Sequence, residues 1–475
     1  MLFNSSIFIF IFLPLCLLFY YLANSKYRNI ILLFFSVFFY SWGEPDVIIF
    51  MLLCILINYF SAILIEIGYG KKALIFGIVS SISMLFYFKY FVFFLESSNT
   101  ILSYFNFHIE YFKDIKKIAL PIGISFYTFQ SLSYLIDVYR KEVKAQRNLV
   151  SLATLITMFP HLIAGPIIRY KDLENELAER KLSLLLFSEG TERFILGLAK
   201  KVIIANSCAY VADNIFNVGF ENLNFKIAWL GIIAYTLQIY FDFSAYSDMA
   251  IGLAKMLGFR FRENFNYPYT AKSIQDFWRR WHISLSSWFR DYVYIPLGGN
   301  RVSNRKLYFN LFIVFFLTGL WHGASFSFVF WGLFHGLFLV LEKVGILNIL
   351  IKIPIINRIY TILIVMIGWV FFRVEKISDA FLYIKSLLGF GIQSQIPMQF
   401  FIDKYHFAII LLGIIFIFPV YNKVKLYYNS YFDQFGLKYQ IIVQSFYFIF
   451  LISLFIISIS FISSGTYSPF IYFRF

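Results

Sequence analysis

Charged residues are scarce in this sequence: they occupy 14% of its 475 positions, against 60% for hydrophobic residues. A water-soluble globular domain carries roughly 25% charged residues and is about half apolar. The mean hydropathy of +0.73 agrees with this contrast. A water-soluble protein is therefore excluded, and we expect the chain to reside in a lipid bilayer.

Cysteine is also scarce, since Cys16, Cys54 and Cys208 are the only three and lie far apart inside apolar segments. This placement predicts small core residues rather than a disulfide or a metal site. Motifs of several other enzyme classes are missing, namely a Gly-x-Ser-x-Gly elbow, a His-Glu-x-x-His zinc motif and a phosphate-binding loop with Lys-Ser/Thr. The sequence predicts neither a bound metal nor a resident cofactor.

Apolar runs recur along the whole chain, each near the roughly 20 residues that a membrane-crossing helix needs. Clear examples are residues 3–22, 47–65, 73–95, 194–211, 227–241 and 441–461. They lack the alternating pattern of a membrane barrel, so they predict an all-α polytopic membrane protein with about ten to twelve membrane segments. The first run has no basic leader before it and further runs after it, so we expect a membrane helix rather than a cleaved signal peptide.

The net charge of +15 is spread over short loops between the apolar runs. Basic loops alternate with acidic ones, and basic loops face the cytoplasm in most membrane proteins. This pattern places the N-terminus outside. It also makes nucleic acid an unexpected partner, because no basic face is concentrated in one domain.

Two apolar segments are expected to be broken. Residues 148–168 contain Pro160 and Gly165-Pro166 and carry basic residues on both flanks, which is typical of a re-entrant element. Residues 308–341 are too long for one straight crossing of a core about 30 Å thick. Their middle is interrupted by Thr318, Gly319, His322 and Gly323. His322 is thus predicted to lie deep in the membrane, at a break between helices.

His322 is the strongest candidate for chemistry among the six histidines. A neutral imidazole in an apolar cavity can take a proton from a hydroxyl as that oxygen attacks an acyl carbonyl. Gly319 and Gly323 would let a substrate approach the backbone, and Trp321 would supply an apolar wall. The alternative is a buried, hydrogen-bonded structural histidine.

The other histidines have weaker cases. His108 is expected in an outer loop and His406 at the edge of a span, while helix packing or a backbone hydrogen bond accounts for His161 and His335. His282 belongs to residues 276–290, which predict one amphipathic helix. Its stripe would hold Trp278, Trp281, His282, Leu285 and Phe289, with an Asp276–Arg280 pair alongside.

That predicted helix has two possible functions. It is either an interfacial anchor, with Trp and Arg at headgroup level, or a coenzyme-binding element whose guanidinium groups hold phosphates. The arginines concerned are Arg279, Arg280, Arg290 and Arg301. Composition does not separate these two possibilities.

Several motifs occur in an order that resembles the bacterial branch of the membrane-bound O-acyltransferases, above all the alginate and peptidoglycan O-acetyltransferases. They are residues 120–130, 159–166, 240–248, 276–288, 291–301 and 318–323, with the tail 468–475 also similar. The resemblance covers roughly residues 120–372. It implies a ring of helices around a central tunnel, within a single membrane domain over 1–475. The expected divisions are N-terminal helices over 1–115, a catalytic core over 116–375 and C-terminal helices over 376–475.

The resemblance also implies roles for residues and partners. His322 matches the catalytic histidine of the family and His282 its supporting polar residue. The predicted substrate-binding residues are Trp278, Arg279, Trp281, Ser286, Trp288, Arg290, Trp321 and Gly323. The expected donor is acetyl-coenzyme A from the cytoplasm. An extracytoplasmic partner protein would pass the acetyl group to an envelope polysaccharide, with the chain in a bacterial cytoplasmic membrane.

The predicted function is O-acetylation of a cell-envelope polysaccharide, of peptidoglycan or alginate type. D-alanyl transfer to teichoic acid is an alternative within the same family. A transporter that moves an acyl group or lipid without chemistry is an alternative from another class, because broken helices and polar groups at the membrane midplane are typical of transporters too.

Overall fold

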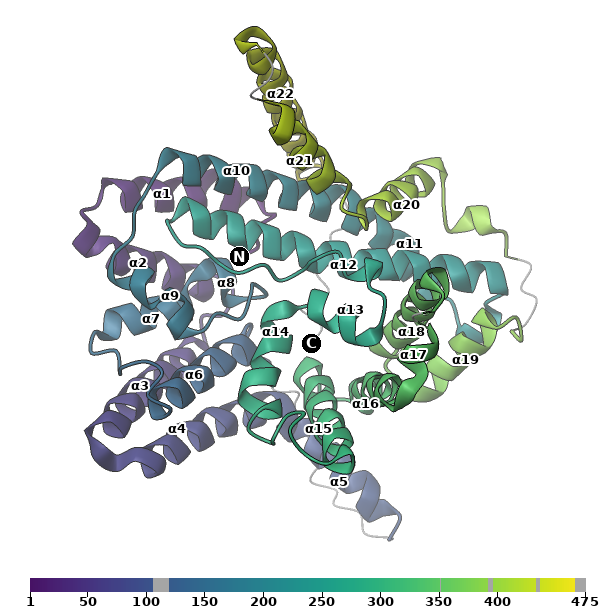
Figure 1. The fold of residues 1–475 in the computed structure, drawn as a ribbon, viewed down its shortest axis with the longest axis horizontal. Helices are drawn as coiled ribbons and strands as arrows, with labels where there is room; N and C mark the ends of the chain where they lie inside the picture. Colours follow the sequence, from purple (N-terminus) through teal and green to yellow (C-terminus); the bar gives the residue numbers. More distant parts are fainter. Residues whose placement is uncertain (106–118, 351, 392–395, 433–435, 466–475) are drawn as a thin grey trace.

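The computed structural model describes residues 1–105, 119–350, 352–391, 396–432 and 436–465 (Figure 1). Every regular element in these ranges is a helix, as predicted. A helix satisfies its backbone hydrogen bonds within itself, which a segment in lipid must do because it meets no water. In the labels used below, η marks a π-helical or 3₁₀ turn.

The N-terminal part forms helical hairpins. Its helices are η1 (Phe8–Phe12), α1 (Leu13–Leu22), α2 (Arg28–Ser41), α3 (Ile48–Leu64), η3 (Ile65–Tyr69), α4 (Gly70–Leu85), η4 (Phe86–Tyr90) and α5 (Phe91–Ser103). The helices α3 and α4 pack against each other. The chain reverses between them at Gly68, whose φ of 118° is available to glycine but strained for other residues.

The segment 148–168 is broken, as predicted. It contains α7 (Leu149–Thr157) and the single turn α8 (Phe159–Leu162), with Pro160 in that turn. It lies between α6 (Ile124–Tyr139) and α9 (Tyr170–Ala178). Because every residue from 151 to 170 is buried, protein surrounds the irregular backbone.

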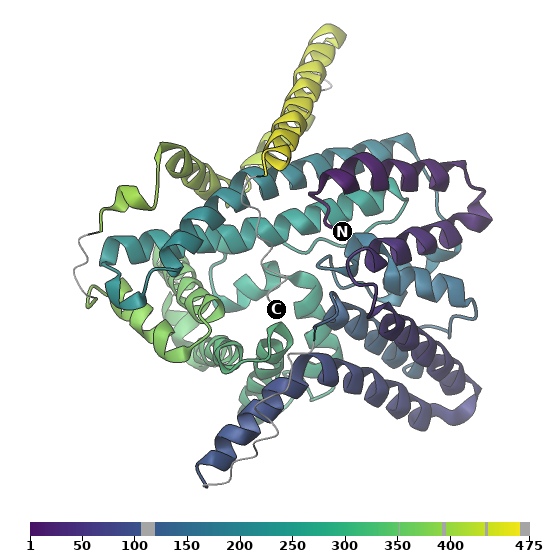
Figure 2. The ribbon, with the colours of Figure 1, turned by 180° about the vertical axis from the view of Figure 1, so that it is seen from behind.

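The helix α12 (Phe225–Met256) is the core of the fold. Its apolar residues surround the whole helix and 89% of its apolar window is buried, as expected of a helix covered on all sides. It packs against α10 (Leu184–Ala199), η6 (Lys200–Ala205) and α11 (Asn206–Phe216). Gly190 and Gly252 bring α10 and α12 together, since a Cβ on either would lie 2.6 Å from the carbonyl oxygen of the other. Figures 1 and 2 show the two helices side by side.

Several helices converge at the middle of the molecule, below α12 in Figure 1. They are α13 (Ile274–Arg280), α14 (Ile283–Phe289), η9 (Arg290–Tyr294), α15 (Asn304–His322) and α16 (Phe326–Leu341). The helices η10 (Glu342–Ile346), α17 (Leu347–Leu350), α18 (Pro354–Arg373) and α19 (Ile377–Leu387) follow. The pairs α15–α16 and α16–α18 are in contact.

Several of the predicted membrane segments are helices long and apolar enough to cross a membrane. Within the described ranges, six helical stretches are long and apolar enough to cross a membrane, or seven if the bent pair of α20 (Lys404–Phe416) and α21 (Val420–Phe432) counts as one span. The stretch Ile48–Ser103 counts once although it reverses at Gly68. Other apolar runs form shorter or broken helices. The chain is nonetheless helical and apolar enough for several crossings.

The last described helix, α22 (Leu437–Ser463), stands away from the body in both views (Figures 1 and 2). Only 11% of its apolar window is buried. Its base contacts α10 and η6. A helix that exposes this much apolar surface needs lipid or another protein around it.

Candidate active site

The break predicted within residues 308–341 is confirmed. The helix α15 ends at His322, Gly323 is extended, and α16 begins after Ser325, whose side chain accepts a hydrogen bond from the Phe328 amide. Side-chain capping of this kind gives the second helix a defined start. His322 is therefore held at the C-terminal end of a helix whose partner helix begins four residues later.

The glycines around His322 have a packing function. A Cβ on Gly319 would lie 2.3 Å from the Phe328 carbonyl oxygen, and a Cβ on Gly323 would lie 2.3 Å from the Phe328 ring. A Cβ on Gly332 would lie 2.2 Å from the Phe315 carbonyl oxygen. These glycines let α15 and α16 approach each other closely. The sequence had predicted a different function for Gly319 and Gly323, namely close approach of a substrate to the backbone. Substrate contact at Gly323 stays a prediction.

Aromatic rings enclose the His322 imidazole. The ring centroids of Trp321 and Trp331 lie 5.0 Å from it, and that of Phe372 lies 5.2 Å away. His322 is 3% exposed, and neither ring nitrogen has a hydrogen-bond partner among the described residues. Buried polar groups are almost always satisfied, so these nitrogens call for water or a substrate as partner.

His282 lies at a second helix break. The predicted continuous helix over 276–290 is wrong, because α13 ends at Arg280 and α14 begins at Ile283. His282 has a φ of 43°, a left-handed conformation that is strained for a non-glycine residue. The Asp276–Arg280 pair is confirmed at 2.9 Å. The break turns His282 inward, with its ring centroid 5.7 Å from that of Trp321.

Asn264 fixes the tautomer of His282. The Asn264 Oδ1 atom accepts from the Ser284 backbone N–H at 3.1 Å, so this atom must be the oxygen of the amide. The same oxygen lies 3.2 Å from His282 Nδ1, which must therefore carry the proton. His282 Nε2 is left with a lone pair and has no partner among the described residues. The His282 and His322 rings both pack against the Trp321 ring.

The predicted substrate-binding tryptophans are internal. Trp278 packs edge-on to Trp331 at 5.6 Å and Trp281 lies 4.9 Å from Trp369. Trp288 stacks on Phe129 at 3.9 Å and donates from Nε1 to the Phe129 carbonyl at 3.0 Å. All three are buried within the protein, which does not fit an anchor at headgroup level.

The predicted polar binding residues are not gathered around His322. Arg279 and Arg290 are exposed, and Arg290 bonds Asp291. Ser286 Oγ donates to the Trp281 carbonyl at 3.3 Å. The structure thus brings His282, Trp321 and His322 together and leaves the two arginines at the surface. Binding of substrate by any of these residues stays a prediction.

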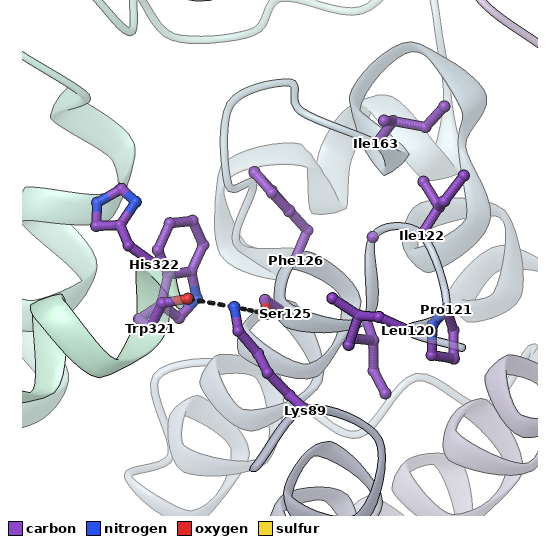
Figure 3. Close-up of a pocket in the computed structure, with 11 residues that line it drawn as sticks. Lys89, Leu120, Pro121, Ile122, Ser125, Phe126, Ile163, Trp321 and His322 are labelled. Atoms are coloured by element: carbon purple, nitrogen blue, oxygen red, sulfur yellow. Dashed lines mark hydrogen bonds between the residues drawn. The ribbon is translucent and has the colours of Figure 1, made fainter. Parts of the chain in front are cut away.

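A pocket leads to His322 from the side of α6. Its empty volume of about 560 Å³ includes space that is open to solvent. Its lining residues are Lys89, Leu120, Pro121, Ile122, Gly123, Ile124, Ser125, Phe126, Ile163, Trp321 and His322 (Figure 3). Gly123 has a φ of 76°, and a Cβ there would lie 2.4 Å from the Leu162 carbonyl oxygen. One end of the segment 148–168 is thereby packed against the pocket wall.

Lys89 is a site residue that the sequence analysis missed. Its ammonium lies between the Trp321 carbonyl and Ser125 Oγ (Figure 3). The signal was present, because Lys89 interrupts the apolar run 73–95 and an ionisable residue inside a span is a functional candidate.

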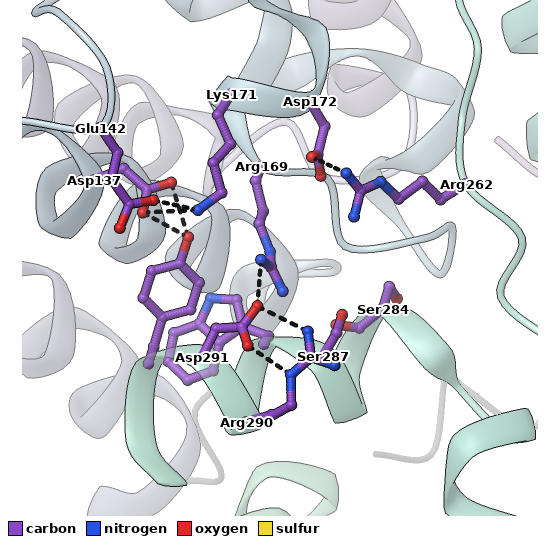
Figure 4. A network of polar contacts seen from close by, with 12 residues as sticks. Asp137, Glu142, Arg169, Lys171, Asp172, Arg262, Ser284, Ser287, Arg290 and Asp291 are labelled. Atoms are coloured by element: carbon purple, nitrogen blue, oxygen red, sulfur yellow. Dashed lines mark hydrogen bonds and ion pairs between the residues drawn. The ribbon is translucent and has the colours of Figure 1, made fainter. Parts of the chain in front are cut away.

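A polar network joins η9 to α6 and α9 (Figure 4). Asp291 accepts from Arg169 at 2.7 Å and from Arg290 at 2.6 Å. The Tyr292 hydroxyl lies 2.8 Å from both Asp137 oxygens, and Lys171 pairs with Asp137 at 3.4 Å. The network locks the chain that follows α14, and so supports the helix carrying Trp288.

Replacing Asp291 by Asn should destabilise the protein, because the Arg169 side chain is 6% exposed and would lose its charged partner. Burial raises the pKa of Asp291, but hydrogen bonds from Arg290 and Arg169 outweigh burial and hold this pKa below its usual value. A lowered carboxylate pKa stabilises the fold above the unfolded-state pKa of about 3.9, and this stabilisation is lost as the pH falls through the folded-state pKa.

We therefore expect thermal unfolding in detergent to show a loss of about 1.5–3 kcal/mol for Asp291→Asn at neutral pH, shrinking below about pH 4. Asp172→Asn is the matched control, since its partner Arg262 is 72% exposed and surface pairs contribute about 0–1 kcal/mol. Equal losses for the two variants would contradict the argument.

The remaining histidines are structural or peripheral. His161 is buried, with Nδ1 2.9 Å from Gln130 Nε2 and Nε2 2.8 Å from the Leu155 carbonyl, which confirms the backbone hydrogen bond expected there. His335 packs against Trp331 and Trp278, without a hydrogen bond among the described residues. His406 pairs with Asp403 at 2.8 Å. His108 and the tail 468–475 lie outside the described residues.

The three cysteines are free and buried, as predicted. In the part of the chain that the structure describes, no group of three or more His, Cys, Asp and Glu side chains is arranged to hold a metal ion. The candidate chemistry therefore centres on the two inward-facing imidazoles and the pocket.

Comparison with known proteins bears on this site. The model of the membrane-bound O-acyltransferase family matches residues 34–374, which include the pocket and both histidines. A protein named as a probable alginate O-acetylase from Pseudomonas aeruginosa is 46% identical over 398 residues, covering 82% of this chain and 75% of the relative. The peptidoglycan O-acetyltransferase of Helicobacter pylori is 35% identical over 437 residues, covering 82% and 80%. The teichoic acid D-alanyltransferase of Bacillus subtilis is 31% identical over 226 residues, covering 45% and 56%.

Proposed function

Because this chain belongs to the membrane-bound O-acyltransferase family, we propose that it moves acetyl groups from a cytoplasmic donor across the membrane for O-acetylation of a cell-envelope polysaccharide. Membership makes the chain an acyltransferase enzyme and a membrane protein of several helices. A conduit without chemistry is therefore not retained. The acetyl group, the direction of transfer and the polysaccharide, of peptidoglycan or alginate type, are the proposed part.

One observation carries the proposal: the buried imidazole of His322 has no hydrogen-bond partner among the described residues and lines a pocket. A neutral ring nitrogen takes the proton of an acceptor hydroxyl while the hydroxyl oxygen forms a bond to the acyl carbonyl carbon. The bond from that carbon to the donor sulfur or oxygen then breaks, and the leaving group receives the proton from His322. Alternatively, His322 first carries the acyl group itself. Both routes use the same ring.

His282 has a supporting role in this proposal. Its Nδ1 proton is fixed by Asn264, so its Nε2 lone pair faces the aromatic cluster that contains Trp321 and His322. A fixed tautomer is the usual way in which a catalytic or supporting histidine is oriented. The tryptophans that pack against both rings are apolar, and an apolar surrounding favours transfer of the acyl group over its hydrolysis.

The proposed donor is acetyl-coenzyme A. Arg279 and Arg290 supply exposed guanidinium groups, which suit phosphate oxygens. Arg279 has no ion pair among the described residues and is the freer of the two, since Arg290 bonds Asp291. We place these arginines on the cytoplasmic side, with the N-terminus outside and the chain in a bacterial cytoplasmic membrane. An extracytoplasmic protein would then accept the acetyl group and esterify the polysaccharide.

The test compares envelope material from cells that have the gene, lack it, or carry it again on a plasmid. Saponification should release acetate from the first and third and at least tenfold less from the second. D-alanine lost in place of acetate would favour the teichoic acid alternative, which the Bacillus subtilis relative supports. No change in either acid would refute both.

A further inference from the structure

Two neighbouring residues of η4 hold the end of α15. Lys89 Nζ donates to the Trp321 carbonyl and, at 3.2 Å, to Ser125 Oγ. The Tyr90 hydroxyl donates to the Leu320 carbonyl at 2.9 Å. Both carbonyls belong to the last turn of α15, immediately before His322. Lys89 and Tyr90 are called the α15 clamp below.

The clamp meets a need of the helix end. The last four carbonyls of an α-helix have no partner within the helix, and the helix dipole makes this end partly negative. An ammonium group placed there is favourable, and Lys89 also lies over the Trp321 ring at 5.8 Å. Both residues belong to the π-helical turn η4, and such turns are frequent at functional sites.

The charge of Lys89 is not used in an ion pair with a carboxylate. No Asp or Glu among the described residues lies within 4 Å of Lys89 Nζ. A lysine inside an apolar helix is costly unless something specific holds it. Here the Trp321 carbonyl and the Ser125 hydroxyl bind it, and it lines the same pocket as His322.

We infer that Lys89 and Tyr90 are positioning residues, which hold the last turn of α15 so that His322 faces the pocket. This inference rests on the proposed function. Lys89 contributes more than Tyr90 because it also ties α15 to Ser125 at the start of α6 (Figure 3). A shift of about 1 Å in a reacting group can cost about a hundredfold in rate, so loosening this end should slow transfer without unfolding the protein.

The experiment uses the full chain in membrane vesicles with acetyl-coenzyme A, and cells producing the same variants. Lys89→Met removes the ammonium at similar length, Lys89→Arg keeps a charged donor, and Tyr90→Phe removes only the second bond. Lys72→Met is the matched control, because Lys72 is an exposed lysine at the start of the same hairpin arm. Release of coenzyme A gives kcat and KM, saponified acetate gives the result in cells, and thermal unfolding reports stability.

We expect Lys89→Met to lower kcat about a hundredfold with KM changed less than about threefold, and with an unfolding temperature close to wild type. Lys89→Arg should have a kcat at least about tenfold higher than that of Lys89→Met, and Tyr90→Phe should lower kcat about tenfold or less relative to wild type. The double variant Lys89→Met/Tyr90→Phe should lose less than the product of the single losses, because both residues act on one helix end. Lys72→Met should match wild type.

Wild-type acetate in Lys89→Met cells would overturn the inference alone. So would a Lys89→Met defect that Lys89→Arg does not relieve and that scales with lost stability, since a purely structural role predicts this. If cells with the wild-type chain show no more envelope acylation than cells with His322→Ala, the proposed function fails and takes this inference with it. The wild-type comparison therefore separates the two failures.

Discussion

Replacing His322 by Ala is expected to reduce envelope O-acetylation at least about a hundredfold. This is the smallest rate loss expected if His322 is a general base, and a larger loss is expected if it is a nucleophile. The fold should survive, because neither His322 ring nitrogen bonds another described residue, so the loss is confined to packing among Trp321, Trp331 and Phe372. Acetate released by saponification measures the effect, and the amount of monodisperse protein extracted in detergent measures folding.

His335→Phe is the matched control for losing a buried imidazole from the same aromatic cluster. His335 packs against Trp331 and Trp278 and does not line the pocket. Phenylalanine fills a similar space, so this variant should keep acetylation within about tenfold, as fits a conservative core exchange. Normal acetylation in His322→Ala cells would refute the assignment of the site.

Replacing Asp242 by Leu is expected to destabilise the protein by about 3–5 kcal/mol, the usual cost of breaking a buried ion pair. Asp242 on α12 lies 2.6 Å from Lys201 on η6, with side chains 2% and 4% exposed. The single change removes the carboxylate that pairs with the buried Lys201 ammonium. Thermal or denaturant unfolding in detergent measures the loss.

The double variant Lys201→Met/Asp242→Leu removes both charges and should lie within about 1–2 kcal/mol of wild type, since apolar replacement of a whole buried pair is often neutral or stabilising. Glu189→Gln is the control for an exposed pair, because Glu189 and Lys255 are partly exposed and such pairs contribute about 0–1 kcal/mol. If the double variant is as unstable as Asp242→Leu, the lost stability comes from other contacts of these two side chains and not from an unbalanced buried charge.

Local patterns predicted the break at His322. Thr318, Gly319, His322 and Gly323 lie in the middle of a 34-residue apolar run, which is too long for one straight crossing, and α15 does end at His322. The broken segment 148–168 followed from Pro160 and Gly165 in the same way. Family membership was predictable because the matching motifs are local and ordered. The assignment of chemistry to His322 stays a proposal.

Other features depend on contacts that no local pattern reports. The spacing of residues 276–290 suits a continuous helix, but Asn264 bonds both His282 and Ser284 and stabilises the break between α13 and α14. Lys89 meets Trp321 across 232 positions of sequence. The internal placement of Trp278 and Trp281 depends on α16 and α18, which come later in the chain. Such features arise only when distant helices pack.

The π-helical turn at η4 amounts to one extra residue in a helix. If that residue were absent, everything after it would rotate by about 100° around the axis, since an α-helix has 3.6 residues per turn. Whether Lys89 on η4 faces α15 thus depends on the number of residues in the turn and not only on the chemistry of the lysine side chain. A related sequence with the same lysine but one residue fewer here would present it to a different face, and its ammonium would need another partner.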